Sequence, residues 1–429
     1  MARTSRTSVI RSSCCDRSAC CIVCALRKTW RACWASSGPT PSATHVPQPR
    51  ARDCSRIVAR WSSRSSCCGP PGARVPEYLW AESESWARRV LLAPLLLAEG
   101  PYRLGAWLHR SVYQRGLRRV IRLPPRVISI GNLTVGGSGK TPLVSWLAGE
   151  LRARGRKVAI LSRGVRGSRS AEVNVVSDGE RVFFSAAEVG DEPVWLASTV
   201  PGVPVLAGRN RVALGLRASA VFGAEILILD DGFQHHRVAR DLNLVCIDAR
   251  LGLGNGHVLP RGPLREPRSA LSQADAILFT RVPVEPGPAP RALGLPPGLL
   301  RFGVRIATRG LRALDGSELS APDVLRGQKV ALLTAIARPD RLKREIEALG
   351  AEVTELRAYP DHHLYTRAEI EALDPARQWL TTAKDAVKIP PSWAAGRRVA
   401  VVEQEVRPDE PQRLLEWIVD SLDRVHRSV

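Results

Sequence analysis

Short runs of apolar residues alternate with amphipathic stretches from residue 126 onward. Runs rich in β-branched and aliphatic side chains have the length of buried strands at 126–130, 157–162, 224–231, 241–249 and 274–282. Helical patterns, such as the one over 140–154, lie between them. Continuous apolar strands separated by helices predict an α/β protein whose sheet is mostly parallel and covered on both faces.

The same alternation returns in the last third of the chain. The stretch 284–298 is dense in Pro and Gly and predicts an exposed connection. Strand and helix patterns resume over 329–356, and a late strand is predicted at 397–406. We therefore expect a core domain at 126–299 and a second, smaller α/β domain at 300–429.

A glycine-rich turn joins the first predicted strand to the first predicted helix, in the sequence "ISIGNLTVGGSGKTP". Glycines allow backbone N–H groups to converge on phosphate oxygens, and the start of a helix adds partial positive charge. Lys140 would reach the outer phosphates and the Thr141 hydroxyl would bind Mg²⁺. The usual signature has glycine where this chain has Thr134, and a Ser- and Gly-rich turn without a ligand is the alternative. The residues assigned to nucleotide binding are Thr134, Gly136, Gly137, Ser138, Gly139, Lys140 and Thr141.

The first 75 residues differ from the rest in charge and in cysteine content. They hold 13 Lys and Arg against 2 Asp and Glu, which is +11 of the net +22, and nine of the ten cysteines. No sustained strand or helix period runs through them, so we predict a disordered or non-native extension. Metal binding at Cys21 and Cys24 lacks a second matched pair, and the apolar run is too short for a signal peptide. Only Cys246 lies beyond residue 75, which suits a reducing compartment.

Residues 76–125 combine Leu, Trp and Tyr with arginine. The apolar run 90–98 is broken by Pro94 and is shorter than the ~20 residues that span a bilayer. Trp80, Trp86 and Trp107, with arginines flanking them, are typical of an amphipathic helix in the membrane interface. Docking of this helix on the protein's own core is the alternative.

Two carboxylates end the predicted strand 224–231. In a parallel sheet, Asp230 and Asp231 would meet the nucleotide at the strand ends and hold Mg²⁺ or its waters. Capping of the next helix is the alternative. His235 and His236 follow in "GFQHHR", and the sequence leaves open which of them faces the site.

A second acidic pair, Asp191 and Glu192, lies in "VGDEP" ahead of an apolar helical run. Asp191 either caps that helix or acts as general base for a hydroxyl group. A base needs a partner that tunes it, and "PDHHLYT" of the second domain offers two candidates, His362 and His363.

Arginine-bearing loops follow two of the predicted strands. The loop "LPRGPLREP" supplies Arg261, Arg265 and Glu266, which suit an anionic substrate group or the transferring phosphoryl group. The loop "SRGVRG" supplies Arg163 and Arg166. Surface arginines without a role are the alternative for each.

Together these segments resemble the tetraacyldisaccharide 4′-kinase family. The resemblance rests on the phosphate-loop sequence and on "LSRGVRG", "VGDEP", "ILDDGFQHHRVARDLNLVCIDA", "LPRGPLREP", "YPDHHLYT" and "TTAKDAVK". It implies a P-loop kinase-type fold and the ATP- and Mg²⁺-dependent phosphorylation of the 4′-hydroxyl of a lipid A disaccharide 1-phosphate, giving lipid IVA. By motif position it assigns catalysis to Lys140, Asp191, Arg265 and His362, Mg²⁺ binding to Thr141, Asp230 and Asp231, and substrate contact to Arg163, Glu192, His235 and Glu266.

The resemblance also implies a location. It places a peripheral enzyme at the cytoplasmic face of the bacterial inner membrane, with a membrane-contacting helix that matches residues 80–115. We expect a monomer that binds no nucleic acid. Two positions depart from the family, since Val165 replaces a usual Tyr and Ala383 replaces the Glu of "TTEKD".

The competing class is a phosphate-loop ATPase that switches conformation at a membrane or on a partner. A GTPase is disfavoured because "TAKDAVK" lacks the Asn-Lys-x-Asp order. The combination of "GDEP" with "DHH" favours a kinase, since a switch has no need of an acid–histidine pair. Nucleic-acid binding rests on net charge alone, and half of that charge lies in the first 75 residues.

Overall fold

The computed structural model describes residues 86–427, except 166, 283–294 and 318. The predictions for residues 1–75, for Arg166 and for most of the connection 284–298 therefore lie outside the described residues. All of the predicted strands lie inside them.

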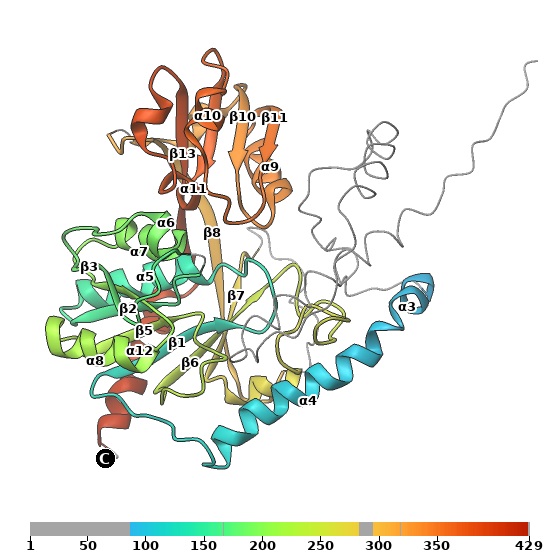
Figure 1. The fold of residues 1–429 in the computed structure, drawn as a ribbon, viewed down its shortest axis with the longest axis vertical. Coiled ribbons are helices and arrows are strands. Elements are labelled where there is room, and N and C mark those ends of the chain that lie inside the picture. The colour runs from blue at the N-terminus through green and yellow to red at the C-terminus, as the bar shows by residue number, and fades with distance from the viewer. Residues whose placement is uncertain (1–85, 166, 283–294, 318, 428–429) are drawn as a thin grey trace, which may run out of the picture. The chain divides into compact units, whose positions relative to one another are not determined.

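Within the described residues, thirteen strands form one sheet (Figure 1). Its order is β11-β10-β12-β13-β8-β7-β6-β1-β5-β2-β4-β3, with β9 paired to β8. The strands are β1 (Arg126–Asn132), β2 (Val158–Ser162), β3 (Asn174–Ser177), β4 (Val205–Ala207), β5 (Ile226–Asp230), β6 (Leu242–Asp248), β7 (Ala276–Thr280), β8 (Leu300–Ala313), β9 (Leu319–Ser320), β10 (Lys329–Thr334), β11 (Glu352–Ala358), β12 (Gln378–Thr382) and β13 (Arg398–Pro408). The predicted α/β fold with a mostly parallel sheet is confirmed.

The order of the central strands decides which loops meet. The first two predicted strands, β1 and β2, are not neighbours, because β5 pairs in parallel with both. Ile130 near the end of β1 is in register with Asp230 at the end of β5. The predicted phosphate loop and the predicted metal carboxylates therefore leave the sheet at the same edge.

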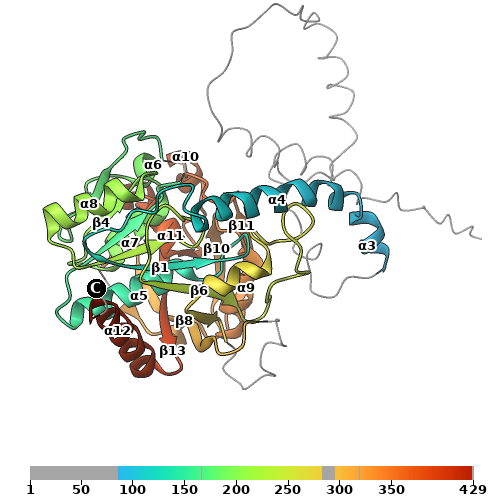
Figure 2. The ribbon, with the colours of Figure 1, turned by 90° about the horizontal axis from the view of Figure 1, so that it is seen from below.

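Helices cover both faces of the central sheet (Figure 2). Apolar residues of α5, α7 and α12 pack on one face, and those of α8 pack on the other. The helices of the core are α5 (Lys140–Ala153), α6 (Ala186–Val189), α7 (Asp191–Thr199), α8 (Arg211–Phe222), the 3₁₀ helix η2 (Arg268–Gln273) and α12 (Pro411–Arg427).

Residues 322–395, which we call the C-terminal lobe, follow the antiparallel strand β8 and precede its partner β13. These two strands run from the central sheet to the lobe (Figure 1). The lobe holds β10 to β12, the helices α9 (Pro339–Ala348), α10 (Arg367–Glu371) and α11 (Ala383–Ala386), and the 3₁₀ helices η3 (Pro322–Leu325) and η4 (Pro391–Ala394). The last helix, α12, returns to the central core. The predicted domain boundary at 299/300 stays a prediction.

Two helices precede the sheet, α3 (Trp86–Leu92) and α4 (Leu95–Gln114), and they are separated at Pro94 as the sequence indicates. Glu99 of α4 is buried and accepts hydrogen bonds from His257 Nδ1 at 2.9 Å and from the Val258 N–H at 3.2 Å. One side of α4 is thus docked on the core. None of the described helices combines the length and hydrophobicity that crossing a membrane requires.

Candidate active site

The glycine-rich loop lies between the end of β1 and the start of α5. Lys140 Nζ lies 2.9 Å from Asp231 Oδ1 and 3.1 Å from Asn132 Oδ1, so the amine points back over the loop. Gly139 has φ +78°, and a Cβ added there would come within 2.7 Å of Ile306 Cδ1. Only glycine meets both the backbone conformation and the close approach of β8.

The other predicted loop residues share this edge. Gly136 and Gly137 are exposed, Thr134 and Thr141 are partly buried, and Ser138 is buried. The Ser138 carbonyl accepts a hydrogen bond from Thr280 at 2.6 Å, and its own Oγ has no partner among the described residues. The structure brings these residues together, and their nucleotide contacts stay predictions.

The two strand-end carboxylates have different environments. Burial and the nearby Glu192 raise the pKa of Asp230 to about 7, and its Oδ1 has no hydrogen-bond partner among the described residues. Burial also acts on Asp231, but Lys140 and Arg265, the latter 3.0 and 2.8 Å from its two oxygens, hold the pKa of that carboxyl well below its usual range. Neither carboxylate is the N-cap of a helix.

Asp191 of the central core and His362 of the C-terminal lobe lie side by side. His362 Nδ1 lies 2.8 and 2.9 Å from the two carboxylate oxygens of Asp191. Asp191 is the first residue of α7, whose N-cap is Gly190, and its Oδ1 accepts a hydrogen bond from the Glu192 N–H in the first turn at 2.9 Å. His362 has φ +63°, an uncommon conformation for a residue with a Cβ, at the turn that presents its ring. The predicted pairing between the core and the C-terminal lobe is therefore present in the structure.

Two lysines, Lys384 and Lys388, complete the surroundings of Asp191. Lys384 Nζ lies 3.9 Å and Lys388 Nζ 3.8 Å from Asp191 Oδ2, and Lys384 also lies 3.1 Å from Glu192 Oε1. Burial raises the pKa of Asp191, but His362, Lys384 and Lys388 outweigh it and leave that pKa below its ordinary value. Sequence reasoning gave these lysines no role, although both lie in the quoted segment "TTAKDAVK".

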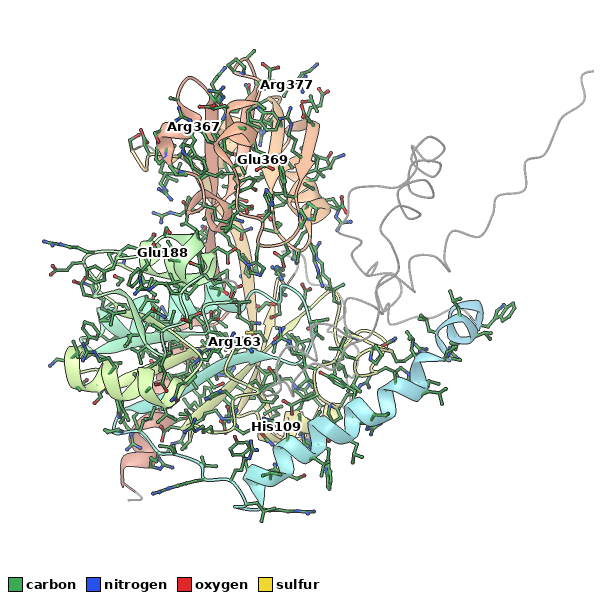
Figure 3. The ribbon with its side chains drawn as sticks, viewed as in Figure 1. His109, Arg163, Glu188, Arg367, Glu369 and Arg377 are labelled. Carbon is green, nitrogen blue, oxygen red and sulfur yellow. The ribbon has the colours of Figure 1, made fainter. Side chains whose placement is uncertain are left out.

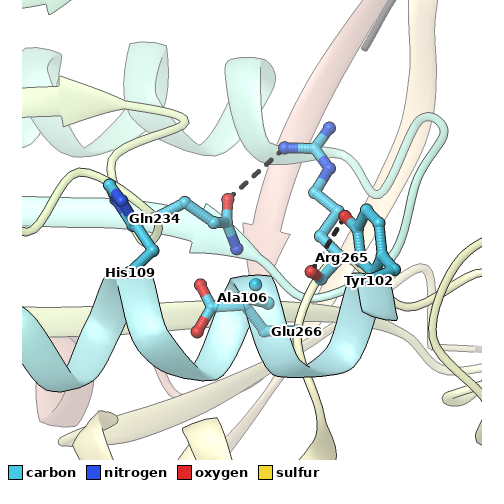
Figure 4. A pocket seen from close by; sticks show the side chains of 7 residues that line it. Tyr102, Ala106, His109, Gln234, Arg265 and Glu266 are labelled. Carbon is cyan, nitrogen blue, oxygen red and sulfur yellow. Dashed lines mark hydrogen bonds between the residues drawn. The ribbon is translucent and has the colours of Figure 1, made fainter. Parts of the chain in front are cut away.

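A pocket of about 350 Å³ lies between α4 and the loop that carries Arg265 and Glu266 (Figure 4). Gln234 lines it too, and Arg265 Nη1 contacts the Gln234 Oε1 atom at 3.5 Å. Tyr102 of α4 donates a hydrogen bond to the Arg265 carbonyl at 3.1 Å. Burial raises the pKa of Glu266. The predicted Arg265 and Glu266 thus lie at one pocket, to which Tyr102 and Gln234, not singled out in the sequence, also belong.

The two histidines after the strand-end carboxylates face different neighbours. The ring of His236 lies 5.6 Å from that of His109 and 6.0 Å from that of Tyr113, so it packs against α4. Burial, then nearby arginines, lowers the pKa of His235 to about 4. Arg163 contributes to that shift, and its side chain is exposed just after β2 (Figure 3). His235 is therefore the histidine on the Arg163 side, and its substrate contact stays a prediction.

The chain matches, over residues 89–423, the family described as tetraacyldisaccharide-1-P 4′-kinase. It is 46% identical over 342 residues to a tetraacyldisaccharide 4′-kinase of Anaeromyxobacter dehalogenans, covering 76% of this chain and 90% of that relative. It is 40% identical over 332 residues to one of Geobacter sulfurreducens, covering 76% of this chain and 93% of that relative. A crystal structure of LpxK from Aquifex aeolicus in complex with ATP has a TM-score of 0.66 and 31% identity, covering 77% of this chain and 99% of its own.

These similarities span the central sheet and both sides of the site, and they define a kinase. Within that class, the chain belongs to the tetraacyldisaccharide-1-P 4′-kinase family. The family, the fold class and the enzyme class expected from the motifs are thereby confirmed.

Proposed function

We propose that this kinase transfers the γ-phosphoryl group of ATP to the 4′-hydroxyl of tetraacyldisaccharide 1-phosphate, giving lipid IVA. The observation that carries the proposal is the Asp191–His362 hydrogen bond, which adjoins Glu192, a residue close enough to raise the pKa of Asp230. Phosphoryl transfer needs positioning and charge stabilisation more than covalent chemistry. A carboxylate held ionised by a histidine and two lysines supplies an acceptor for the hydroxyl proton.

The glycine-rich loop is the proposed phosphate-binding loop. The backbone at the exposed residues Gly136 and Gly137, together with Lys140 at the start of α5, suits the outer phosphates of ATP. Lys140 and Arg265 both contact Asp231 in this structure. Two cations at one carboxylate become available to the transferring phosphoryl group if Asp231 changes partners.

The donor set fits Mg²⁺ at this edge. Asp230 has a buried carboxylate oxygen without a hydrogen-bond partner among the described residues, and Thr141 adds a hydroxyl at the first turn of α5. No group of three or more His, Cys, Asp or Glu suited to a metal occurs in the part of the chain that the structure describes, so phosphate oxygens and water would supply the other ligands. Bound Mg²⁺ would neutralise phosphate charge. Asp231 is the weaker of the two predicted carboxylate ligands, because Lys140 and Arg265 both contact it.

The pocket beside α4 is the proposed saccharide site, and α4 itself the proposed membrane contact. The pocket offers amide, carboxyl and guanidinium groups that suit hydroxyl and amide groups of a sugar. On its outer side α4 exposes Leu97 at 84%, Leu104 at 55% and Leu108 at 47%. Exposed apolar side chains at these positions suit a monomeric enzyme at the cytoplasmic face of the inner membrane, where its lipid substrate lies.

The test uses the full chain, radiolabelled ATP, Mg²⁺ and tetraacyldisaccharide 1-phosphate in detergent micelles. We expect labelled lipid from the wild type and from the control Arg367→Ala, an exposed arginine of α10. Lys140→Ala and Asp191→Ala should each abolish the label, and EDTA should abolish it until Mg²⁺ is restored. Hydrolysis of ATP without labelled lipid would instead favour the membrane ATPase switch.

A further inference from the structure

Three arginines converge on Asp248, a buried carboxylate at the end of β6. Arg281 Nη1 and Arg341 Nη1 each lie 3.1 Å from Asp248 Oδ2, and Arg338 Nη1 lies 3.8 Å from the same oxygen. Arg281 follows β7, whereas Arg338 and Arg341 come from the start of α9 in the C-terminal lobe. The cluster therefore joins the two parts of the structure on the β6–β7 side of the sheet.

This cluster touches the glycine-rich loop directly. Arg281 Nη1 donates a hydrogen bond to the Gly137 carbonyl at 2.7 Å. Arg338 Nη2 lies 3.5 Å from the position that a Cβ of Gly136 would occupy. In the strand order, β6 and β7 lie on one side of β1, and β5 with its carboxylates lies on the other. The loop thus has arginines along the edge that faces away from Asp230.

Guanidinium groups crowd around Asp248. Three of them lie near this one carboxylate, beside a loop built to hold phosphate. Burial and the neighbouring Arg341 lower the pKa of Arg281 to about 10, so it stays charged at neutral pH. Crowded, partly buried cations are stabilised when an anion with several acceptor oxygens joins them.

We propose that Arg338 is a nucleotide-binding residue that contacts the phosphates of ATP from the C-terminal lobe, and that Asp248 is the positioning residue that holds Arg338, Arg341 and Arg281 around the loop. The inference rests on the proposed phosphate loop and adds to it a contact with the phosphates from the C-terminal lobe. Arg338 is the contacting group because its Nη2 lies 3.5 Å from the position that a Cβ of Gly136 would occupy, at the exposed part of the loop.

The first experiment measures ADP binding by calorimetry without lipid, then KM for ATP and for lipid. Arg338→Ala should weaken ADP binding and raise KM for ATP about 10- to 100-fold, the range of a hydrogen bond to a charged group, and leave KM for lipid unchanged. Arg338→Lys should recover part of the loss because it keeps the charge. The control is Arg344→Ala, an exposed arginine on the same helix that should bind ADP as the wild type does.

The second experiment tests the positioning role. Asp248→Asn should weaken ADP binding in the wild-type background and have little further effect in Arg338→Ala, because the residue acts through the arginine. If the ion pair only stabilises the position of the lobe, Arg338→Ala should lower the urea midpoint of unfolding and leave ADP affinity within twofold of wild type. That result would overturn the proposal. Unchanged ADP affinity in Lys140→Ala would instead contradict the proposal that the glycine-rich loop binds phosphate.

Discussion

Single residues at this site are held in states that their burial opposes. Asp191 is buried but ionised, because the hydrogen bond from His362 and the charges of Lys384 and Lys388 outweigh desolvation. Lys388 is itself buried and pairs with Asp385 at 2.6 Å. The site therefore depends on matched buried charges, and removing one partner has consequences at the other.

Replacement of His362 by Gln tests the tuning of Asp191. Burial then acts with less opposition, so the pKa of Asp191 rises and the acid limb of the pH–kcat/KM profile moves to higher pH. Turnover should fall about 10²-fold or more, while KM for ATP stays within twofold of wild type. A profile whose acid limb does not move would show that His362 leaves the ionisation of Asp191 unaffected.

Replacement of Lys388 by Met tests the buried pair. Asp385 would keep its hydrogen bonds from Thr334, at 2.9 Å, and Thr382, at 2.8 Å, but would lose its counter-charge. The free energy of unfolding in urea should drop by about 3–5 kcal/mol. The control is Lys329→Met, which breaks an exposed pair with Glu352 and should cost about 1 kcal/mol or less. Equal losses in the two variants would contradict the argument.

At the scale of elements, the sequence predicted those strands, turns and helices that depend on a short local pattern. The strand, glycine-rich turn and helix over 126–154 followed from an apolar run that ends at glycines, and β5 and β6 followed from similar runs. The long strand β8 was not predicted, because Arg301, Arg305 and Arg309 interrupt its apolar pattern. Which strands pair is decided by packing between distant segments, so the place of β5 between β1 and β2 was out of reach.

The same limit applies to side chains. Asp191 and His362 were paired as a hypothesis because both stood out in short motifs. Lys384 and Lys388 were missed, since a lysine in a polar segment usually faces solvent. The cluster at Asp248 was missed because its four members come from three distant segments, and only the sheet order and the position of α9 bring them together.

Helix α4 presents a face that tests the membrane proposal. At 100° per residue, Leu96, Leu97, Leu104, Trp107 and Leu108 fall within an arc of about 120°, and all five are exposed. Replacing Leu97, Leu104 and Leu108 together by Glu should release the protein from sedimented vesicles that contain anionic lipid, while its ADP affinity stays that of wild type. Unchanged sedimentation would remove α4 as the membrane contact.

The opposite side of α4 is predicted to dock in a pH-dependent way. Burial lowers the pKa of His236 to about 4 from 6.5, so between these pH values the unfolded chain binds the proton more readily. The stability from neutral His236 is therefore present above pH 6.5 and is lost as pH falls toward 4. In urea unfolding, His236→Phe should lose less stability than wild type over this window, by on the order of 1–2 kcal/mol after solvent screening. Equal losses of stability in the wild type and in His236→Phe between pH 6.5 and 4 would contradict this role of His236.

At the scale of the whole described structure, the C-terminal lobe contacts the core at two separate places. On the acceptor side Lys384 meets Glu192 at 3.1 Å, and on the nucleotide side Arg341 meets Asp248 at 3.1 Å. Strands β8 and β13 are the connections that carry the lobe. Contacts on both sides of one rigid lobe are energetically linked if the lobe moves as a unit on those strands.

A double-mutant cycle on kcat/KM measures this link. Lys384→Met removes the contacts of the lobe with Asp191 and Glu192, Arg341→Met removes its contact with Asp248, and the two side chains share none of these partners. If the lobe closes as a unit, loss of either contact opens it, so the second substitution has less to remove and the coupling energy exceeds about 0.5 kcal/mol. If β8 and β13 hold the lobe fixed, the two effects add within about 0.3–0.5 kcal/mol. Additivity would mean that the acid–histidine pair and the arginines at Asp248 act on acceptor and nucleotide independently, with the connecting strands serving only as a frame.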